Sequence, residues 1–458
     1  MELTTRLSTL ADHLSFLAQW LLYRAVLLLE PLRERLPGLG RDPALWVFGA
    51  RGGEAFTGNS KYLYLHVAAE RPAVRPVWLS KDSAVVADLQ SAGYEAYHCY
   101  SLRGLALALR AGVVVLTQGH RDLPMPCCAG AFAVQLWHGV PLKRVSWDAE
   151  FPDLPRPIRR AHGDVADEID LLVVPGSALV DTFASGLRID PGRMALAGYP
   201  RVDALDRAIP GEDVGTDADA LARVRDRASE GRVVAYLPTY RAWTDESVAD
   251  HLDFGALDDF LAERDATLVV KAHPKESLDV PDNRSRIVSL PPETDPYPLL
   301  RHADALVTDY SSAYVDFLAC DRPVVFYPYD VDDYRARRGF YFDYDAVTPG
   351  PVARTFEGLL DGLDRALADP DADAERRRAL RRRLLDADPA VGGADATVGG
   401  ADPAVRATGS TTDRSDADGP LAPRSAAVYD LIWARTGAST GTWFRSCCHG
   451  ARRGRSRR

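Results

Sequence analysis

Residues 304–312 read Asp304-Ala-Leu-Val-Thr-Asp-Tyr-Ser-Ser312 and decide the fold class. The apolar run 305–307 breaks off at a polar turn, and an apolar segment of helical period follows over 313–318. This order predicts a buried strand that feeds a helix. Ser311 and Ser312 would then stand beside the first free backbone N–H groups of the helix, where N–H groups and hydroxyls together bind a phosphate or pyrophosphate. The alternative is that Ser311 only caps the helix, as serine often does.

The same alternation of short apolar strands and helix-length segments extends over most of the chain. The predicted strands form two series, 45–49, 74–79, 113–116, 132–136 and 171–174, then 233–237, 267–270, 287–289, 305–307 and 324–327. Apolar strands separated by helices are typical of parallel sheets with helices on both faces. We therefore expect an α/β fold with two doubly wound, Rossmann-like domains, at 44–209 and 225–385, joined by an acidic linker at 210–224. Ligands of such sheets bind beyond the carboxyl ends of the strands, here in the cleft that the two domains would face.

The composition disfavours several classes of function. The 458 residues carry 55 Lys and Arg against 65 Asp and Glu, a net charge of −10, which argues against a general nucleic-acid binder. The six cysteines form no disulfide framework and no zinc-binding spacing. A Walker loop and an HExxH motif are both missing from the sequence, which disfavours an NTPase or a metallohydrolase. We expect neither a metal nor another cofactor.

The amino-terminal segment 1–43 is predicted to be helical. Residues 10–30 are strongly apolar, but polar and charged side chains such as Arg24 interrupt them. A membrane-spanning helix needs about 20 mostly apolar residues and would bury Arg24 at high cost. A packed helix or an interfacial helix on a membrane surface therefore fits better than a span. The segment also carries basic residues that would suit an anionic leaflet, Arg33, Arg35 and Arg41.

The carboxyl-terminal part changes character beyond residue 385. Residues 386–420 contain a degenerate seven-residue repeat rich in Ala, Asp and Gly, with too few large apolar groups to offset the entropy of ordering. We expect a disordered insertion there. Within 421–458 we expect a helix that returns to the body of the protein, because Val428, Leu431 and Ile432 share a face, and then a basic tail.

Two histidines follow predicted strands. His138 lies in Gln135-Leu-Trp-His-Gly-Val-Pro-Leu-Lys143, and His273 lies in Lys271-Ala-His-Pro-Lys275. An imidazole with a pKa of about 6.5 suits proton transfer from a hydroxyl, and an ammonium group beside it suits an oxyanion. The alternatives are a His138 that is hydrogen-bonded in the packing between domains and a solvated basic loop at 271–275.

Two further motifs present charged side chains at turns. Gly198-Tyr-Pro-Arg-Val-Asp203 carries Arg201 and Asp203, which could also form a surface pair. Tyr236-Leu-Pro-Thr-Tyr-Arg241 ends a strand with Arg241, whose guanidinium would suit a bidentate phosphate contact.

Taken in order, these motifs resemble those of the CDP-glycerol glycerophosphotransferase family of wall teichoic acid synthesis. The resemblance covers residues 44–365 and rests on Gln135-x-Trp-His-Gly-x-Pro-Leu-Lys143, Gly198-x-Pro-Arg-x-Asp203, Tyr236-x-Pro-Thr-x-Arg241, Lys271-x-His-Pro274, Thr308-Asp-Tyr-Ser-Ser312, Asp321-Arg-Pro-Val-Val-Phe-Tyr-x-x-Asp330 and Arg338-Gly-Phe-Tyr-x-Asp343. It implies a two-domain, glycosyltransferase-B type architecture. It also implies transfer of a polyol phosphate from a CDP-activated donor to a hydroxyl of a lipid-linked or polymeric acceptor, with release of CMP.

The resemblance further implies roles for individual residues. His138 and His273 would be the catalytic histidines, with His138 as the base toward the acceptor hydroxyl, although the two roles could be exchanged. The residues expected to bind the substrates are Lys143, Arg201, Asp203, Arg241, Lys271, Asp309, Ser311 and Ser312.

The expected partners follow from the same resemblance. They are CDP-glycerol or a related CDP-polyol, the acceptor, and the cytoplasmic face of the cell membrane, since members of the family are peripheral membrane proteins. No nucleic-acid partner is expected, and a homo-oligomer is left open. Two alternative functions remain, a sugar-nucleotide-dependent glycosyltransferase or epimerase of the same architecture, and a non-catalytic, membrane-associated polymer-binding protein.

Overall fold

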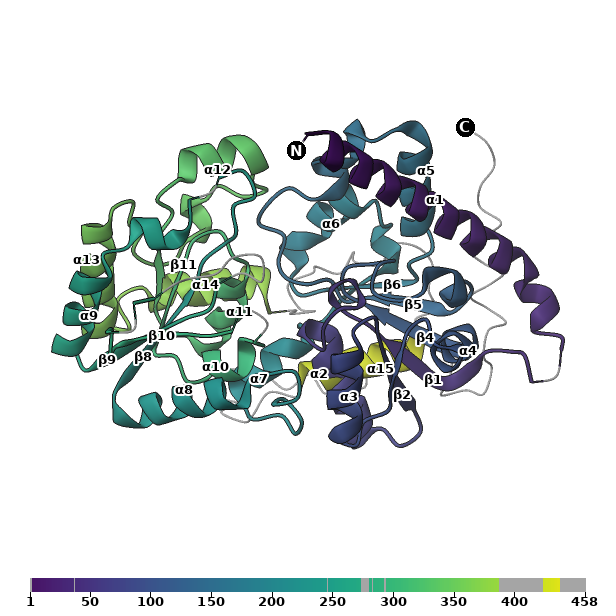
Figure 1. Ribbon diagram of the computed structural model, residues 1–458, viewed down its shortest axis with the longest axis horizontal. Helices are drawn as coiled ribbons and strands as arrows, with labels where there is room; N and C mark the ends of the chain where they lie inside the picture. The colour runs from purple at the N-terminus through teal and green to yellow at the C-terminus, as the bar shows by residue number, and fades with distance from the viewer. Residues whose placement is uncertain are drawn as a thin grey trace.

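The computed structural model describes residues 2–36, 38–244, 246–272, 280–281, 283–291, 294–386 and 423–436. Figure 1 shows two α/β lobes side by side, one containing the first sheet and the other the second. Every strand pairing within the two sheets is parallel. The predicted α/β fold with two doubly wound sheets is therefore confirmed for the described residues.

The first sheet has seven strands in the order β3-β2-β1-β4-β5-β6-β7. Its central strands are buried on both faces, as the continuous apolar runs in the sequence predict. The two short edge strands, β3 and β7, were not predicted from the sequence. The strands are β1 (Asp42–Phe48), β2 (Arg75–Ser80), β3 (Ala96–His98), β4 (Ala111–Leu116), β5 (Phe132–Gln135), β6 (Leu171–Val174) and β7 (Met194–Leu196).

Helices connect these strands and cover the sheet (Figure 1). Several begin at a side chain that accepts a hydrogen bond from the first turn, for example Asp82 before α3 and Ser101 before α4. The helices of this domain are α2 (Gly58–Glu70), α3 (Ser83–Ser91), α4 (Leu102–Arg110), α5 (Arg156–Ala166), α6 (Val180–Leu187) and α7 (Asp203–Asp206).

The second sheet has five strands in the order β10-β9-β8-β11-β12. The strands are β8 (Arg232–Leu237), β9 (Ala266–Val270), β10 (Ile287–Ser289), β11 (Ala305–Thr308) and β12 (Val324–Phe326). The helices around them are α8 (Ala218–Glu230), α9 (Phe254–Glu263), α10 (Tyr297–Leu300), α11 (Ala313–Phe317), α12 (Val331–Arg338), α13 (Phe356–Ala368) and α14 (Ala374–Leu384). The stretch 304–312 thus contains all of β11 and the turn into α11, as predicted.

The last described helix, α15 (Arg424–Thr436), lies on the amino-terminal domain beside α2 (Figure 1). Its Tyr429 stacks on Trp46 of β1 with the ring centroids 5.4 Å apart. The chain therefore crosses back to the first domain after α14. The predicted disordered insertion lies outside the described residues except for residue 386, and the basic tail lies outside them entirely.

Helix α1 (Glu2–Arg33) runs along the outside of the amino-terminal domain (Figure 1). One face is packed, with Phe16 against Ile158 and Ala161 of α5, and Tyr23 against the segment 125–129. Within the described residues, no helix is long and apolar enough to cross a membrane. The prediction of a packed helix holds for this face, while its other face is exposed.

Two expectations about the amino-terminal basic residues and the linker need correction. Arg33 and Arg41 do not face outward, because both bind the buried carboxylate of Glu30, and Arg41 also donates to the carbonyl of Ala111 at 2.7 Å. The segment 210–224, expected to be a linker, contains the first turns of α8 and the buried Glu212. Buried ion pairs, Glu30 with Arg33 and Arg41 and Glu212 with Arg301, therefore order both segments.

Candidate active site

His138 follows β5 on a turn that neighbouring side chains hold in an unusual backbone conformation. Trp137 has a φ of 57°, in the left-handed region that non-glycine residues rarely adopt. Its N–H donates to Gln135 Oε1 at 2.9 Å, and Asn59 Nδ2 donates to the carbonyl oxygens of Leu136 and Trp137 at 3.3 and 3.0 Å. Since Asn59 belongs to α2, a helix of the same domain fixes the backbone that presents His138.

The imidazole of His138 is held in one tautomer. Its Nδ1 lies 3.1 Å from the carbonyl oxygen of Thr117, and a carbonyl can only accept, so Nδ1 carries the proton and Nε2 has the free lone pair. Desolvation by the surrounding protein, together with the charges of Arg201 and Lys143, lowers the pKa of His138 to about 4, although the bond to Thr117 opposes this change. The side chain nevertheless remains accessible to solvent. The imidazole of His138 is therefore neutral at pH 7.

Asp122 holds the segment that supplies the carbonyl of Thr117. Its buried carboxylate accepts from the backbone N–H groups of Thr117 at 2.7 Å, Gln118 at 2.6 Å and Gly52 at 2.7 Å. Burial raises the pKa of this carboxyl group, and the backbone donors lower it in part. One carboxylate thus joins the loops that follow β1 and β4 behind His138.

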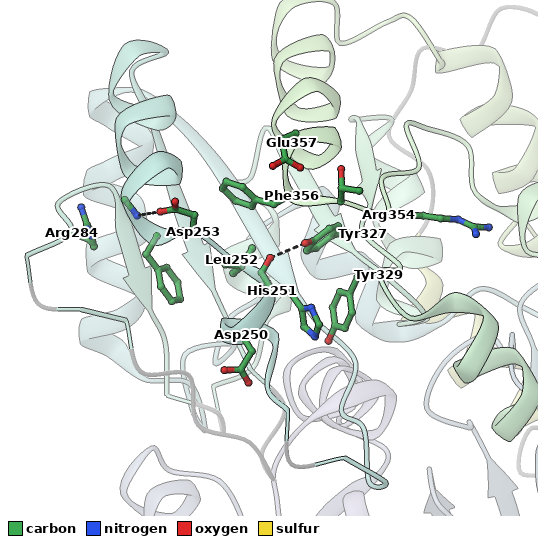
Figure 2. A pocket seen from close by; sticks show the side chains of 13 residues that line it. Asp250, His251, Leu252, Asp253, Arg284, Tyr327, Tyr329, Arg354, Phe356 and Glu357 are labelled. Carbon is green, nitrogen blue, oxygen red and sulfur yellow. Dashed lines mark hydrogen bonds between the residues drawn. The ribbon is translucent and has the colours of Figure 1, made fainter.

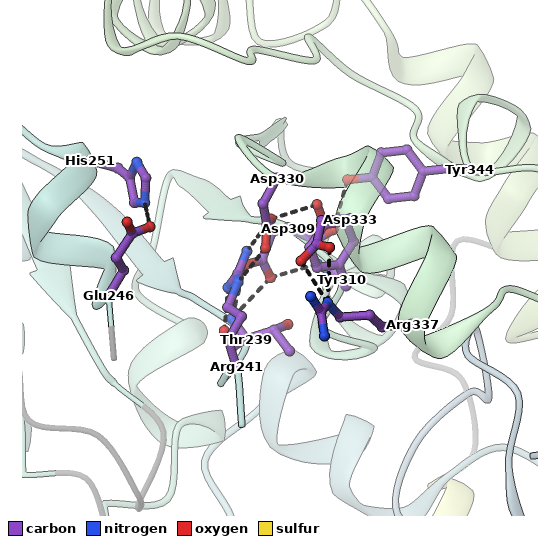
Figure 3. A network of polar contacts seen from close by, with 10 residues as sticks. All are labelled: Thr239, Arg241, Glu246, His251, Asp309, Tyr310, Asp330, Asp333, Arg337 and Tyr344. Carbon is purple, nitrogen blue, oxygen red and sulfur yellow. Dashed lines mark hydrogen bonds and ion pairs between the residues drawn. The ribbon is translucent and has the colours of Figure 1, made fainter. Parts of the chain in front are cut away.

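On the carboxyl-terminal domain, Asp309 is the centre of a buried network (Figure 3). It accepts from the N–H of Thr239 at 3.0 and 3.1 Å and from the N–H of Tyr310 at 2.5 Å. Arg241 donates to it through Nη1 at 2.6 Å. Asp309 therefore joins the turn after β11 to the turn after β8.

The guanidinium of Arg241 is enclosed by carboxylates rather than open to the cleft. Besides Asp309, it binds Asp330 in a bidentate manner, with Nε and Nη2 at 3.0 and 2.8 Å from the two oxygens. Tyr310 donates its hydroxyl to the same Asp330 at 2.9 Å. The sequence predicted a bidentate contact of Arg241 with a phosphate, whereas in this structure the bidentate partner is the carboxylate of Asp330. A direct contact of Arg241 with a phosphate stays a prediction.

Of the two serines of the opening motif, Ser312 lies against the His138 turn. Ser311 Oγ accepts from the N–H of Ala313 at 3.3 Å, whereas the hydroxyl of Ser312 forms no capping bond with α11. A Cβ atom added to Gly139 would lie 2.3 Å from Ser312 Oγ. The turn after β5 in one domain and the turn after β11 in the other therefore meet between the two domains, where the cleft was expected.

Lys143 lies at a second place where the two domains contact each other. It pairs with Phe340 in an antiparallel bridge, and the N–H of Tyr341 donates to the carbonyl oxygen of Leu142 at 2.9 Å. Burial lowers the pKa of Lys143 to about 8, an effect that the nearby Asp309 opposes. Its ammonium group lies 5.7 Å from the ring centroid of Tyr334. Lys143 is thus a partly desolvated cation near the Asp309 network.

Among the remaining predicted site residues, the structure describes Lys271 and Asp203. Lys271 directly follows β9, and its Nζ donates to the carbonyl oxygen of Ala272 at 3.4 Å. His273 lies outside the described residues. Asp203 accepts from the N–H groups of Arg424 and Ser425, at 2.8 and 2.9 Å, and from the hydroxyl of Ser425 at 2.7 Å. Its carboxylate is thus used to hold the start of α15, and a substrate contact is not needed to explain it.

A pocket of about 820 Å³ opens on the carboxyl-terminal domain where α9 and α13 begin (Figure 2). His251 stacks on Tyr329 in its wall, with the ring centroids 3.8 Å apart. A second pocket of about 430 Å³ shares these two residues and reaches Arg241. The two pockets therefore lie beside the Asp309 network. Neither pocket was predicted from the sequence.

The groups that meet at the cleft define what chemistry is available. The first domain supplies the unprotonated Nε2 of His138 and the cation of Lys143. The second domain supplies the turn 308–312, called the serine turn below. Among the described residues, no group of three or more His, Cys, Asp or Glu side chains could hold a metal ion. The arrangement can remove a proton from a hydroxyl and stabilise an anion beside it.

The comparison with protein families agrees with the motifs. The family model of CDP-Glycerol:Poly(glycerophosphate) glycerophosphotransferase matches residues 34–389. The chain belongs to this family. The match includes both sheets and each of the motifs described above.

Two curated relatives in this glycerophosphotransferase family are teichoic acid poly(glycerol phosphate) polymerases. The one from Bacillus subtilis strain 168 is 26% identical over 339 residues, which cover 71% of this chain and 44% of the relative. The one from Bacillus spizizenii is 25% identical over 340 residues, 71% of this chain and 84% of the relative. The chain thus spans less than half of the first relative's length.

Solved structures of a wall teichoic acid polymerase support the fold. A structure of the wall teichoic acid polymerase TagF superposes with a TM-score of 0.64 at 23% identity, over 84% of this chain and 94% of that one. This likeness confirms the expected glycosyltransferase-B type architecture.

Four side chains were not predicted: Asn59 and Asp122, described above, and Tyr297 and Asp316 of the second domain, which hydrogen-bond to each other at 2.6 Å while Asp316 also binds Arg201. Asp316 had a recognisable signal, because it interrupts the otherwise apolar helix segment 313–318 and such a charge is rarely buried without a partner. Asn59 directly follows the loop after the first strand, where a polar residue is expected to face the cleft. Asp122 and Tyr297 had no such signal, since their partners lie far away in the sequence or on the backbone.

Proposed function

We propose that the protein transfers glycerol phosphate from CDP-glycerol to a hydroxyl group of a polymeric or lipid-linked acceptor and releases CMP. Membership of the family supports the reaction class. The curated relatives, named as poly(glycerol phosphate) polymerases, favour glycerol phosphate over other polyol phosphates. The observation that carries the proposal is His138, whose unprotonated Nε2 stands on a turn that meets Ser312.

The proposed step needs one base and several anion-binding groups. His138 Nε2 takes the proton of the acceptor hydroxyl, and the hydroxyl oxygen bonds to the phosphorus that carries glycerol. The bond from that phosphorus to the bridging oxygen breaks, and CMP leaves with the electron pair. Phosphoryl transfer of this kind depends mainly on positioning and charge stabilisation.

We infer that the anion-binding groups come from the motifs that follow β5, β9 and β11. The hydroxyls of Ser311 and Ser312, the ammonium groups of Lys143 and Lys271, and His273 would bind the pyrophosphate. Lys143 supports this role, because an ammonium group with little hydration interacts strongly with an anion. Arg241 would hold Asp309 in place rather than contact the donor. If donor binding released it from Asp309 and Asp330, it would bind a phosphate directly.

The deciding experiment measures CMP release from CDP-glycerol, with CDP-ribitol and a UDP-sugar as competing donors. We expect CMP with CDP-glycerol, and a loss of about 10²- to 10⁴-fold in kcat for His138→Ala. His273→Ala is measured alongside, and His98→Ala, on the edge strand β3, is the matched control that keeps full activity. UDP release without CMP would replace this proposal by a sugar-nucleotide transferase, and no release from any donor would favour a polymer-binding protein.

We further propose that α1 binds the cytoplasmic face of the cell membrane. Five leucines at helical spacing on its outer face are between 54% and 81% exposed, an unusual density of apolar surface: Leu10, Leu14, Leu21, Leu28 and Leu32. Binding to anionic vesicles by flotation should fall at least tenfold in Leu21→Glu/Leu28→Glu. The control Leu102→Glu, at an exposed site on α4, should float as well as the wild type. Equal flotation of all three proteins would refute a role for α1.

A further inference from the structure

A buried cluster of three side chains connects the two turns of the active site. Arg201 Nη1 donates to the backbone carbonyl of His138 at 2.9 Å, and its Nη2 donates to Asp316 Oδ2 at 2.5 Å. The hydroxyl of Tyr297 donates to the same carboxylate oxygen at 2.6 Å. Arg201 belongs to the first domain, whereas Tyr297 and Asp316 belong to the second.

The positions of these residues relate them to both halves of the site. Asp316 lies on α11, one helical turn after Ser312. The carbonyl that Arg201 binds belongs to His138 itself, and Gly139 follows it in contact distance of Ser312. The guanidinium of Arg201 therefore links the backbone of His138, the proposed base, to α11, the helix that follows the serine turn.

Stability alone is a poor explanation for this cluster. Arg201 is 6% exposed and Asp316 is completely buried, so both charges lose their hydration, and such pairs are often no more stable than apolar side chains of similar size. Among the described residues, Arg201 Nε and Asp316 Oδ1 have no hydrogen-bond partner although both are buried. A fork of fixed geometry that reaches two acceptors is what a guanidinium offers and an apolar pair does not.

Other ion pairs also join the domains but reach neither turn. Lys61 of α2 binds Asp295 at 2.8 Å, and Arg301 binds Glu212 at 2.5 Å. They contribute to the contact between the domains, as does an apolar cluster with residues from both. The Arg201 cluster differs because its partners are the His138 carbonyl and α11.

We propose that Arg201, Asp316 and Tyr297 are positioning residues that fix the distance between the His138 base and the serine turn of the donor site. This assigns Arg201 a role different from the substrate contact expected from its motif. The inference rests on the proposed function for its kinetic consequence, because the reaction needs the acceptor hydroxyl and the donor phosphorus in line.

The kinetic test compares variants that keep the fold. Asp316→Asn retains the size of the side chain and an acceptor for Tyr297, and it should lower kcat by about 10- to 100-fold while the KM for CDP-glycerol changes less than threefold. Arg201→Lys should fall as far, because an ammonium group lacks the fork that reaches both acceptors. A folded Asp316→Asn with a kcat within twofold of the wild type would overturn the proposal.

A third variant separates positioning from stability. Arg201→Met/Asp316→Leu/Tyr297→Phe removes the charges and the hydroxyl together, so its urea midpoint should stay near that of the wild type while kcat remains low. The matched control Glu212→Gln removes a charge from another interdomain pair, and it should lose stability but keep its kcat. Recovery of kcat together with stability in the triple variant would mean that the cluster is only structural.

A substrate-free measurement distinguishes failure of this inference from failure of the proposed function. Hydrogen exchange of a peptide covering residues 136–141 should speed up at least tenfold in Asp316→Asn, although the substitution lies in the other domain, and should be unchanged in Glu212→Gln. If the wild type released no CMP, the proposed function would fail and this exchange would still report the connection. Unchanged exchange in Asp316→Asn would refute it.

Discussion

At the scale of single residues, the site depends on how neighbours restrict each functional group. The sequence placed His138 at the end of a strand but left its tautomer and pKa undetermined. The carbonyl of Thr117 sets the tautomer, and the surrounding protein sets the pKa. The same holds for Arg241. The sequence predicted that its guanidinium binds a phosphate, whereas in the structure it binds Asp309 and Asp330.

The pH dependence of kcat/KM should reflect two lowered pKa values. A base is active when neutral, so with the pKa of His138 near 4 activity should persist from pH 7 down to pH 5 and disappear only as the pH falls through about 4. Lys143 loses its charge as the pH rises through about 8, which should set the alkaline limb. A profile measured with circular dichroism at each pH checks that the protein stays folded. An acid limb at 6.5 or above would contradict this prediction.

Gly139→Ala should nearly abolish activity without unfolding the protein. The new Cβ would lie 2.3 Å from Ser312 Oγ, and Gly139 has a φ of 144°, where a side chain is strained. The two turns must then separate, which we expect to lower kcat by about 100-fold. Gly130→Ala, at another positive φ, next to Glu30 and away from the cleft, is the control for backbone strain. A Gly139→Ala enzyme with normal kcat would show that the turns need not touch.

At the scale of secondary structure elements, α15 ties the end of the described chain to the amino-terminal domain. Its apolar face was visible in the sequence as Val428, Leu431 and Ile432, but the surface it covers was not. The carboxylate of Asp203, 222 residues before Ser425, receives its first N–H groups. At least one residue of the motif at 198–203, Asp203, therefore serves to hold the start of α15.

Asp203→Ala should release the start of α15. Three hydrogen bonds to a buried carboxylate are lost, and we expect the free energy of unfolding in urea to fall by about 1–3 kcal/mol. Hydrogen exchange should speed up in residues 424–430 before the rest of the domain. Asp206→Ala, which removes only an exposed pair with Arg424, should cost less than about 1 kcal/mol. Equal effects of the two substitutions would argue against a special role for Asp203.

At the scale of the whole molecule, buried polar contacts connect the two domains. Lys61 and Asp295 have fully buried side chains, and Tyr62 donates to the same carboxylate at 3.0 Å. Removing one charge of such a pair leaves the other unpaired in a site with little water. The relative position of the two sheets is therefore sensitive to single charges far from the cleft.

Lys61→Met should lower the free energy of unfolding by about 3–5 kcal/mol, because Asp295 remains buried without its counter-charge. Adding Asp295→Leu should restore most of the loss, since the apolar pair has no charge to desolvate. Urea denaturation followed by fluorescence and circular dichroism checks both values. A Lys61→Met protein as stable as the wild type would mean that water reaches Asp295 in solution.

The sequence by itself determined the parallel sheets, most strand positions, the motifs at the strand ends and the family resemblance. These are local properties, because an apolar run of a few residues is buried whichever neighbour it has, and a turn follows where the run stops. It did not determine which charges pair: Arg201 meets Asp316 across 115 positions, and Arg241 meets Asp309 across 68. Such partners depend on the packing of one domain against the other and of one strand end against the next. Only the tertiary structure therefore decided which motif side chains face the cleft and which support it from behind.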